Sequence, residues 1–184
     1  MAIAPGAHIV GPESGTIEVR TYREGAARRV GHDLVIEVSR WRATVEVGDS
    51  AVPSSITLEV DPHSLHVREG LRGVKPLSDR ERTEIRNKID EEILRGEPIV
   101  FRSSAIEHSD GRLTVRGELA IAGTTRPATF KLNVDEHGQV SATLPVTQSD
   151  WAIKPYRAFM GALKVRDTIE VILDVSLPAD APTA

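Results

Sequence analysis

The sequence predicts an all-β fold, an antiparallel barrel of eight strands with a single helical insertion. Short segments in which apolar and polar residues alternate recur along most of the chain, and turn residues separate them. Only one stretch has helical spacing, and strands do not alternate with helices as they do in parallel sheets. Because each segment has one apolar face, a single curled sheet would bring these faces together around a shared interior.

The clearest strand signals lie between residues 112 and 134. Apolar residues alternate with polar ones over residues 113–121 and again over residues 128–134. Between them, residues 123–127 supply a glycine that tolerates positive φ and a proline that fixes φ. We expect a hairpin with a turn at residues 123–127, and Gly117 would leave free volume on its apolar face.

Similar alternation predicts the remaining strands. Residues 34–47 are expected to form one long bent strand or a tight pair, and a turn at Asp61 and Pro62 divides the next run. The other predicted strands cover residues 15–20, 56–60, 65–67, 99–107, 139–147 and 169–175.

The predicted helix runs from about Asp79 to Leu94. A Ser-x-x-Glu capping box begins at Ser78, isoleucine recurs at every fourth position, and Gly96 supplies a stop signal. The apolar stripe is only one row wide, which suits a helix that lies across the outside or mouth of a sheet. We therefore interpret the helix as a lid or plug.

The length of 184 residues suits a single domain with a sizeable core. We expect residues 1–14 to form an N-terminal arm, residues 15–177 the barrel domain and residues 178–184 a C-terminal tail. Only seven residues are aromatic, so aliphatic side chains must fill most of the interior.

Charge and cysteine content exclude several classes of function. The net charge is −4 with both signs well mixed along the chain, which predicts neither a nucleic-acid partner nor a polybasic membrane signal. The absence of cysteine excludes disulfides, thiol catalysis, iron–sulfur clusters and cysteine-ligated zinc. The first residues lack the features of a secretory signal and no apolar run reaches membrane-spanning length, so a cytoplasmic protein is expected.

Several motifs occur together in one order along the chain. They are GHDL at residues 31–34, GVKPL at 73–77, I-x-F-x-S at 99–103, the hairpin pattern G-x-L-x-I-x-G-x-TRP at 117–127, and KP followed by GALKV-x-D at 154–167. From residue 15 to residue 177 the chain resembles the YceI-like, polyisoprenoid-binding family of lipocalin-like bacterial proteins.

The resemblance implies an eight-stranded lipocalin-like barrel that holds a long isoprenoid or similar amphipathic lipid for transport, storage or sequestration. It implies no cofactor and no chemistry, so the protein is not expected to be an enzyme. Such binding is physically reasonable, because each buried CH2 group contributes about 0.8 kcal/mol. Many members of the family carry a secretory signal, so the ligand of this chain is expected to differ from theirs. A homodimer is compatible with this interpretation.

The expected ligand-binding residues are apolar and lie on the inward faces of the strands or in the irregular segment before the last strand. Trp151, Phe159 and Met160 belong to that segment and would either plug one end or grip the ligand at the opening. Polar groups at the mouth would orient the ligand, and His32 and Lys154 are the candidates for head-group contacts. The remaining candidates are Ile17, Val19, Leu34, Ile36, Val38, Leu58, Phe101, Leu119, Phe130, Leu132, Leu144, Val171 and Leu173.

Two alternatives stay open. An enzyme that acts on such a lipid could use His32 with Asp33, although no serine or cysteine motif accompanies the pair. A closed barrel with a filled core could instead serve as an interaction module. A metal site at His63 and His66 is disfavoured, since residues three apart on a strand face opposite sides, and no metal is expected.

Overall fold

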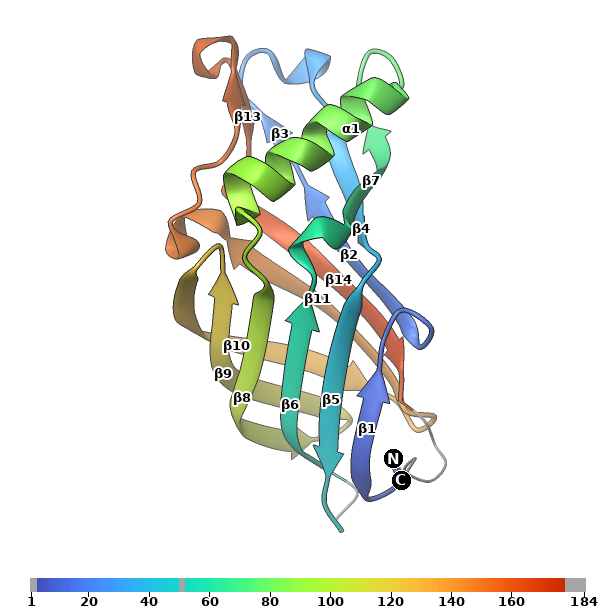
Figure 1. The fold of residues 1–184 in the computed structure, drawn as a ribbon. Coiled ribbons are helices and arrows are strands. Elements are labelled where there is room, and N and C mark those ends of the chain that lie inside the picture. The colour runs from blue at the N-terminus through green and yellow to red at the C-terminus, as the bar shows by residue number, and fades with distance from the viewer. Residues whose placement is uncertain (1–2, 50–51, 178–184) are drawn as a thin grey trace.

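Strands supply most of the regular structure (Figure 1). The computed structural model describes residues 3–49 and 52–177, and the tail predicted at residues 178–184 lies outside this part. The strands are β1 (Gly6–Val10), β2 (Gly15–Thr21), β3 (Arg23–Glu24), β4 (Asp33–Val38), β5 (Trp41–Val47), β6 (Pro53–Val60), β7 (Leu65–Leu71), β8 (Ile99–Ser109), β9 (Arg112–Ile121), β10 (Thr124–Val134), β11 (Gln139–Thr147), β12 (Arg157–Ala158), β13 (Leu163–Val165) and β14 (Thr168–Ser176).

Within the described residues, eleven strands form one antiparallel sheet in the order β1-β5-β6-β8-β9-β10-β11-β14-β2-β4-β7. Consecutive strands β1 and β2, β4 and β5, and β6 and β7 are halves of three long bent strands. The register runs on across the bends, since Val38 pairs with Leu65 on one side and Trp41 pairs with Val60 on the other. Counted as long strands, the described sheet has eight, and the pairing of β2 with both β14 and β4 curls it into a barrel. The predicted fold class is confirmed.

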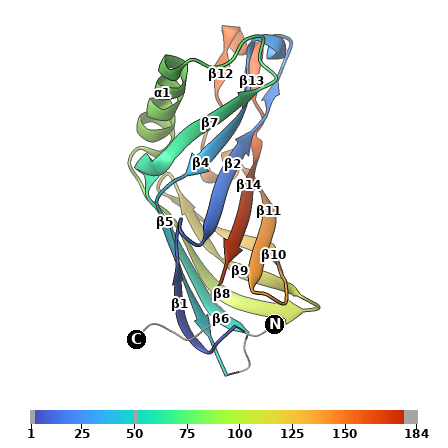
Figure 2. The same cartoon turned by 90° about the vertical axis from the view of Figure 1, so that its right-hand side faces the viewer.

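The bend between the two halves of the barrel is held by polar groups of the turn Pro62–Ser64. The Ser64 hydroxyl is fully buried and lies within hydrogen-bond distance of the main-chain oxygens of Arg40 (3.1 Å) and Asp61 (2.7 Å). The Asp61 carboxylate accepts a hydrogen bond from the His63 main-chain nitrogen at 2.8 Å. These bonds satisfy the backbone where strand pairing is interrupted. The strands of the two halves therefore run in different directions, as the side view shows (Figure 2).

The hairpin of β9 and β10 has a shorter turn than expected. Ala122 and Gly123 alone connect the strands, with φ of 51° and 77°. Two residues with positive φ suit the right-handed twist of a tight hairpin. Residues 124–127 therefore pair with β9, Thr124 opposite Ile121 and Pro127 opposite Glu118, and the prediction of a turn through residue 127 is wrong.

Gly117 does not provide free volume for a ligand. A Cβ atom at this position would lie 2.1 Å from the main-chain oxygen of Arg102 and 2.8 Å from the Phe101 ring. The register between β8 and β9 shifts beside it, between Ser103 and Ala105. The glycine is thus explained by the close approach of two strands and an aromatic ring.

The N-terminal segment is part of the sheet and not a separate arm. Strand β1 pairs with β5 over five residues, and Ile3 and Val10 are each only 2% exposed. His8 is also buried, and its Nε2 donates a hydrogen bond to the main-chain oxygen of Ala4 at 2.6 Å. The prediction of an arm separate from the domain missed this segment, because only a few residues of β1 alternate.

The barrel wall is weakest between β10 and β11. These strands pair only through Asn133 with Ser141 and Val134 with Val140, close to one end. Further along, the turn Gln148–Trp151 lies beside β10, where Arg126 Nε donates to the main-chain oxygen of Asp150 at 3.1 Å. This turn therefore contacts the part of the β10 edge that does not pair with β11.

One end of the barrel carries three irregular segments, residues 22–31, 71–77 and 154–166, which we call the tip. A small sheet of β12, β13 and β3 joins two of them, and the main-chain nitrogen of Ala27 donates to the oxygen of Ala162 at 2.8 Å. The His32 ring contacts the third segment, since its Nε2 donates to the main-chain oxygen of Lys75 at 2.7 Å. The tip lies at the upper end in both views (Figures 1 and 2).

The predicted helix is present with the predicted bounds. Helix α1 covers Asp79–Asn87 and continues as a π-helical turn, Lys88–Leu94, so the two together span residues 79–94. The capping box forms as expected between Ser78 and Glu81. The helix lies obliquely across the upper half of the barrel (Figure 1).

Candidate ligand-binding cavity

A cavity of about 670 Å³ lies inside the barrel and beneath the helix. Its volume falls within the range of small-molecule sites, roughly 300 to 1,000 Å³. Side chains from the long strands, from α1 with its π turn and from the tip line it, and most of them are aliphatic. The arrangement therefore encloses an apolar space with the helix as one wall.

The cavity opens toward the tip. Along β14, Val175 is 4% exposed, whereas Leu173, Val171 and Ile169 become partly exposed as the strand approaches the tip. In the opposite half, Val10 and Val115 also belong to the lining but are almost fully buried, so the space is narrower there. Side chains that face open space keep accessible surface, so this gradient places the wider part of the cavity in the tip half.

Three isoleucines of the lid, which we define as residues 79–94, face the cavity. Ile85, Ile89 and Ile93 are all partly buried and all line it. The isoleucines are spaced four residues apart, which is slightly more than one α-helical turn of 3.6 residues and slightly less than one π-helical turn. In an α-helix alone, each isoleucine would be rotated further around the helix axis than the one before it. The π turn after Asn87 rotates the next one back, so the three side chains stay on one face.

Both ends of the lid are tied to the barrel. At its start Lys75 lies 3.4 Å from Glu81, and the Ser78 main-chain nitrogen donates to the same carboxylate at 2.8 Å. These hydrogen bonds lower the pKa of Glu81 to about 2, with the bond from the Ser78 backbone as the largest cause. At the far end the His63 imidazole lies 2.7 Å from the carboxylate of Asp90. Arg95, just beyond the lid, donates from Nη2 to the main-chain oxygen of Ala122 at 2.8 Å.

Most of the residues expected to bind ligand do line the cavity. Met160 does not, because it sits in a turn with φ of 54° and its side chain is fully exposed at the tip. The expected residues found in the lining are Ile17, Val19, Leu34, Ile36, Val38, Leu58, Phe101, Leu119, Phe130, Leu132, Leu144, Trp151, Phe159, Val171 and Leu173.

The two candidates for head-group contacts lie in different places. His32 lines the cavity near the tip, although its Nε2 is already bonded to Lys75. Lys154 is not part of the lining and lies in a small neighbouring cleft with Lys88 and Glu92. Two other lysines line the cavity, Lys88 on the lid and Lys164 on β13.

His32 and Asp33 do not form a catalytic pair in this structure. The Asp33 carboxylate is buried, accepts a hydrogen bond from the Arg23 main-chain nitrogen at 2.8 Å and lies 3.4 Å from Arg72. Adjacent strand residues point to opposite sides, so the imidazole turns toward Lys75 instead. The pair connects the barrel to the tip.

The side chains around the metal site considered at His63 and His66 are engaged in other contacts. His63 bonds Asp90 of the lid, while Asp61 holds Arg40 at 2.8 Å. No group of three or more metal-ligating side chains occurs among residues 3–49 and 52–177.

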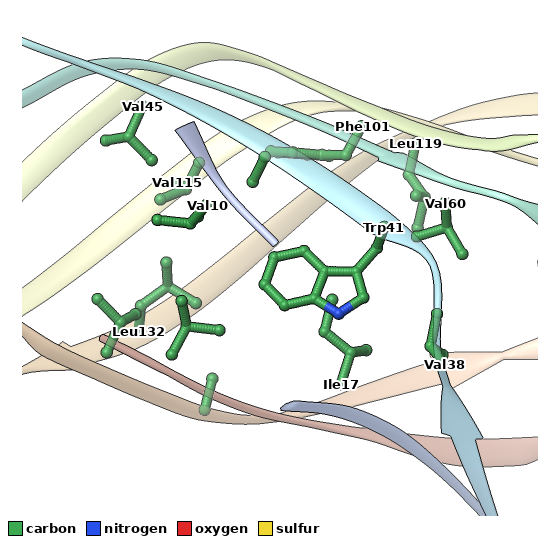
Figure 3. Close-up of a cluster of buried hydrophobic side chains, with 14 of the residues drawn as sticks. Val10, Ile17, Val38, Trp41, Val45, Val60, Phe101, Val115, Leu119 and Leu132 are labelled. Atoms are coloured by element: carbon green, nitrogen blue, oxygen red, sulfur yellow. The ribbon is translucent and has the colours of Figure 1, made fainter. Parts of the chain in front are cut away.

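Trp41 is a cavity residue that was not among the ligand-binding candidates expected from the sequence. It is 6% exposed, lines the cavity and lies among Val10, Ile17 and Val38 (Figure 3). Its indole nitrogen is buried and has no hydrogen-bond partner within the described part of the chain; the hydroxyl of Thr21, another lining residue, shares this property. Its alternation with Ala43 and Val45 on β5 is the signal that could have assigned it to the interior.

Comparison with known proteins decides the family. The model of the YceI-like domain matches residues 22–177. The chain belongs to the YceI-like family. A search of curated protein sequences found no match.

Two solved structures share this fold. Burkholderia cenocepacia BcnA is 15% identical with a TM-score of 0.62, and the match covers 86% of this chain and 94% of that one. The Campylobacter jejuni YCEI protein is 12% identical with a TM-score of 0.56, covering 78% and 84%. At these identities the likeness concerns the fold. As for membrane spans, none of the helices in residues 3–49 and 52–177 is long and apolar enough to be one.

Proposed function

We propose that this YceI-like chain binds an isoprenoid or another long-chain amphipathic lipid in its cavity, as a carrier or store that does not alter the ligand. The observation that carries the proposal is the apolar cavity of about 670 Å³ that the lid covers and that opens at the tip. An aliphatic wall favours a long hydrocarbon chain, because each CH2 group it removes from water contributes about 0.8 kcal/mol.

The unpaired polar groups inside favour an amphipathic ligand over a pure hydrocarbon. The Trp41 indole nitrogen can only donate a hydrogen bond, and its burial without a partner has a cost that a ligand acceptor would remove. The Thr21 hydroxyl, which lies nearer the tip, can donate or accept. A carbonyl, ether or hydroxyl oxygen on the ligand meets both requirements.

The charged end of such a ligand fits best at the mouth. Lys164 lines the cavity there and is only partly exposed. Its ammonium group would pair with an anionic or strongly polar head group while the chain extends toward Leu119 and Leu132. Binding without turnover agrees with the separation of His32 from Asp33.

Lipid extraction tests the proposal directly. The purified protein is extracted with organic solvent, and the extract is examined by mass spectrometry beside native mass spectrometry of the intact protein. We expect a long-chain amphipathic lipid at close to one molecule per chain, or its uptake from polyprenol-containing micelles by delipidated protein. A protein that neither retains nor takes up any such lipid would contradict the proposal.

A further inference from the structure

The tip differs in charge from the rest of the chain. Its segments, residues 22–31, 71–77 and 154–166, contain nine lysine and arginine residues and one acidic residue, Glu24. The rest of the sequence contains 14 basic and 26 acidic residues, so a chain of net charge −4 has one strongly positive end. The charges look well mixed along the sequence, and folding collects the positive ones from three distant segments.

Several of these cations are free to meet a partner. Arg72 is held 3.4 Å from Asp33 and Lys75 lies 3.4 Å from Glu81. By contrast, Arg28, Arg29 and Arg157 are exposed and take part in none of the ion pairs within the described residues. The unpaired arginines come from two different segments, so the positive surface extends across the tip.

The tip also gathers the exposed apolar side chains. Seven large apolar residues of the described chain are exposed, and all except Ile9 are at the tip. Phe159 is 65% exposed, Val74 is 78% exposed and Met160 is fully exposed. Phe159 and Met160 have φ of 50° and 54°, in the left-handed region that non-glycine residues rarely occupy. A sharp turn thus presents two large apolar side chains outward.

The apolar side chains of the tip are continuous with the cavity. Val30, Tyr156 and Phe159 are exposed at the tip and also line the cavity mouth. A ligand leaving the cavity would therefore pass over apolar surface directly to whatever the tip contacts.

We propose that the tip docks on a membrane surface that contains anionic lipids. Interfacial binding requires apolar side chains that enter the headgroup region and basic residues that attract anionic lipids, and the tip carries both. A nucleic acid would use the arginines but would leave Val74 and Met160 in water, so the observations favour a membrane. Docking would hold the cavity mouth against the bilayer. It does not depend on a loaded cavity, so docking and lipid binding can fail separately.

Vesicle flotation of the delipidated full chain tests the proposal. One vesicle preparation contains phosphatidylcholine alone and another contains equal parts of phosphatidylcholine and phosphatidylglycerol. The charge variant is R28E/R29E and the apolar variant is M160S. Matched controls are R112E/K131E, on exposed positions of the distant hairpin, and I9S, at the exposed apolar residue outside the tip. Circular dichroism checks that each variant is folded.

We expect binding to the anionic vesicles to be at least tenfold stronger than to phosphatidylcholine alone and to weaken in high salt. R28E/R29E should reduce it at least tenfold and M160S severalfold, while the two controls should bind as the wild type does. Equal binding to both vesicles, or an equal loss in R112E/K131E, would overturn the proposal. The proposal would also be overturned, in favour of a nucleic-acid partner, if the protein bound no vesicles but bound a random DNA duplex, and R28E/R29E abolished that binding.

Discussion

The indole nitrogen of Trp151 donates a hydrogen bond to the main-chain oxygen of Leu119 at 2.9 Å. The bond joins the turn Gln148–Trp151 to β9 beside the edge where β10 and β11 barely pair. Trp41, the other tryptophan, is equally buried, and its nitrogen has no partner among residues 3–49 and 52–177. One tryptophan therefore holds the wall together, and the other presents a free donor to the cavity.

Replacing each tryptophan by phenylalanine should affect a different property: stability for Trp151 and ligand binding for Trp41. Trp151→Phe leaves the Leu119 oxygen without its donor, so the free energy of unfolding should fall by about 1 to 3 kcal/mol in urea titrations. Trp41→Phe removes a donor that has no protein partner and should change stability by less than about 1 kcal/mol. It should instead weaken binding of a lipid with an oxygen acceptor by about threefold to tenfold. Equal destabilisation by both changes would contradict the assignment.

Gly117→Ala should destabilise the barrel by about 1 to 3 kcal/mol, because the added methyl group meets the Arg102 oxygen and the Phe101 ring. Gly48→Ala is the matched control, since no atom of the described residues lies within 4 Å of a Cβ atom there. Urea unfolding of both variants measures the difference. If Gly117→Ala were as stable as Gly48→Ala, the close approach of β8 and β9 would be refuted.

The carboxyl group of Glu81 should titrate with a pKa of about 2 because Ser78 and Lys75 stabilise its charged form. In the unfolded chain the pKa of this carboxyl group is 4.5, which is higher than in the folded protein. The ionised group therefore stabilises the start of the lid fully above pH 4.5, and this stabilisation is lost as the pH falls through 2. Carbon NMR of the carboxyl group measures the midpoint. Ser78→Ala should move the midpoint upward, whereas a midpoint near 4.5 in the wild type would rule out the capping box.

Ile89→Asp should weaken ligand binding at least about tenfold, because it replaces an apolar cavity contact with a charge that must lose its water. Asn87→Asp is the control, since it adds an aspartate to the exposed face of the same lid. Lipid bound per chain after desalting is the measurement. Equal affinity of the two variants would show that the lid does not contact the ligand.

Alternation in the sequence predicted most of the strands and most of the cavity wall, because the inward face of a barrel strand repeats at every second residue. It assigned Val171 and Leu173 to the interior from the last strand alone. The helix from Asp79 to Leu94 followed from its cap and its isoleucines, although four-residue spacing does not reveal that a π turn keeps them aligned.

Features that depend on contacts between distant segments could not be predicted. The turn at Ala122 and Gly123 was placed too far along, because Pro127 suggested a turn where the proline sits in a strand. Gly117 was interpreted as free volume, since only the neighbouring strand reveals the Arg102 oxygen against it. The charge of the tip was hidden for the same reason, because its basic residues are separated by long stretches of sequence.

The most direct test is lipid uptake by a matched pair of tryptophan variants on β14. Val171→Trp places a large ring inside the cavity, whereas Ile172→Trp places the same ring on the opposite face of the same strand. Delipidated proteins are incubated with polyprenol-containing micelles and desalted, and the lipid bound per chain is measured by mass spectrometry. We expect close to one lipid per chain for the wild type and Ile172→Trp and at most about a tenth of that for Val171→Trp. Equal uptake by the two variants would show that the lipid does not occupy the cavity.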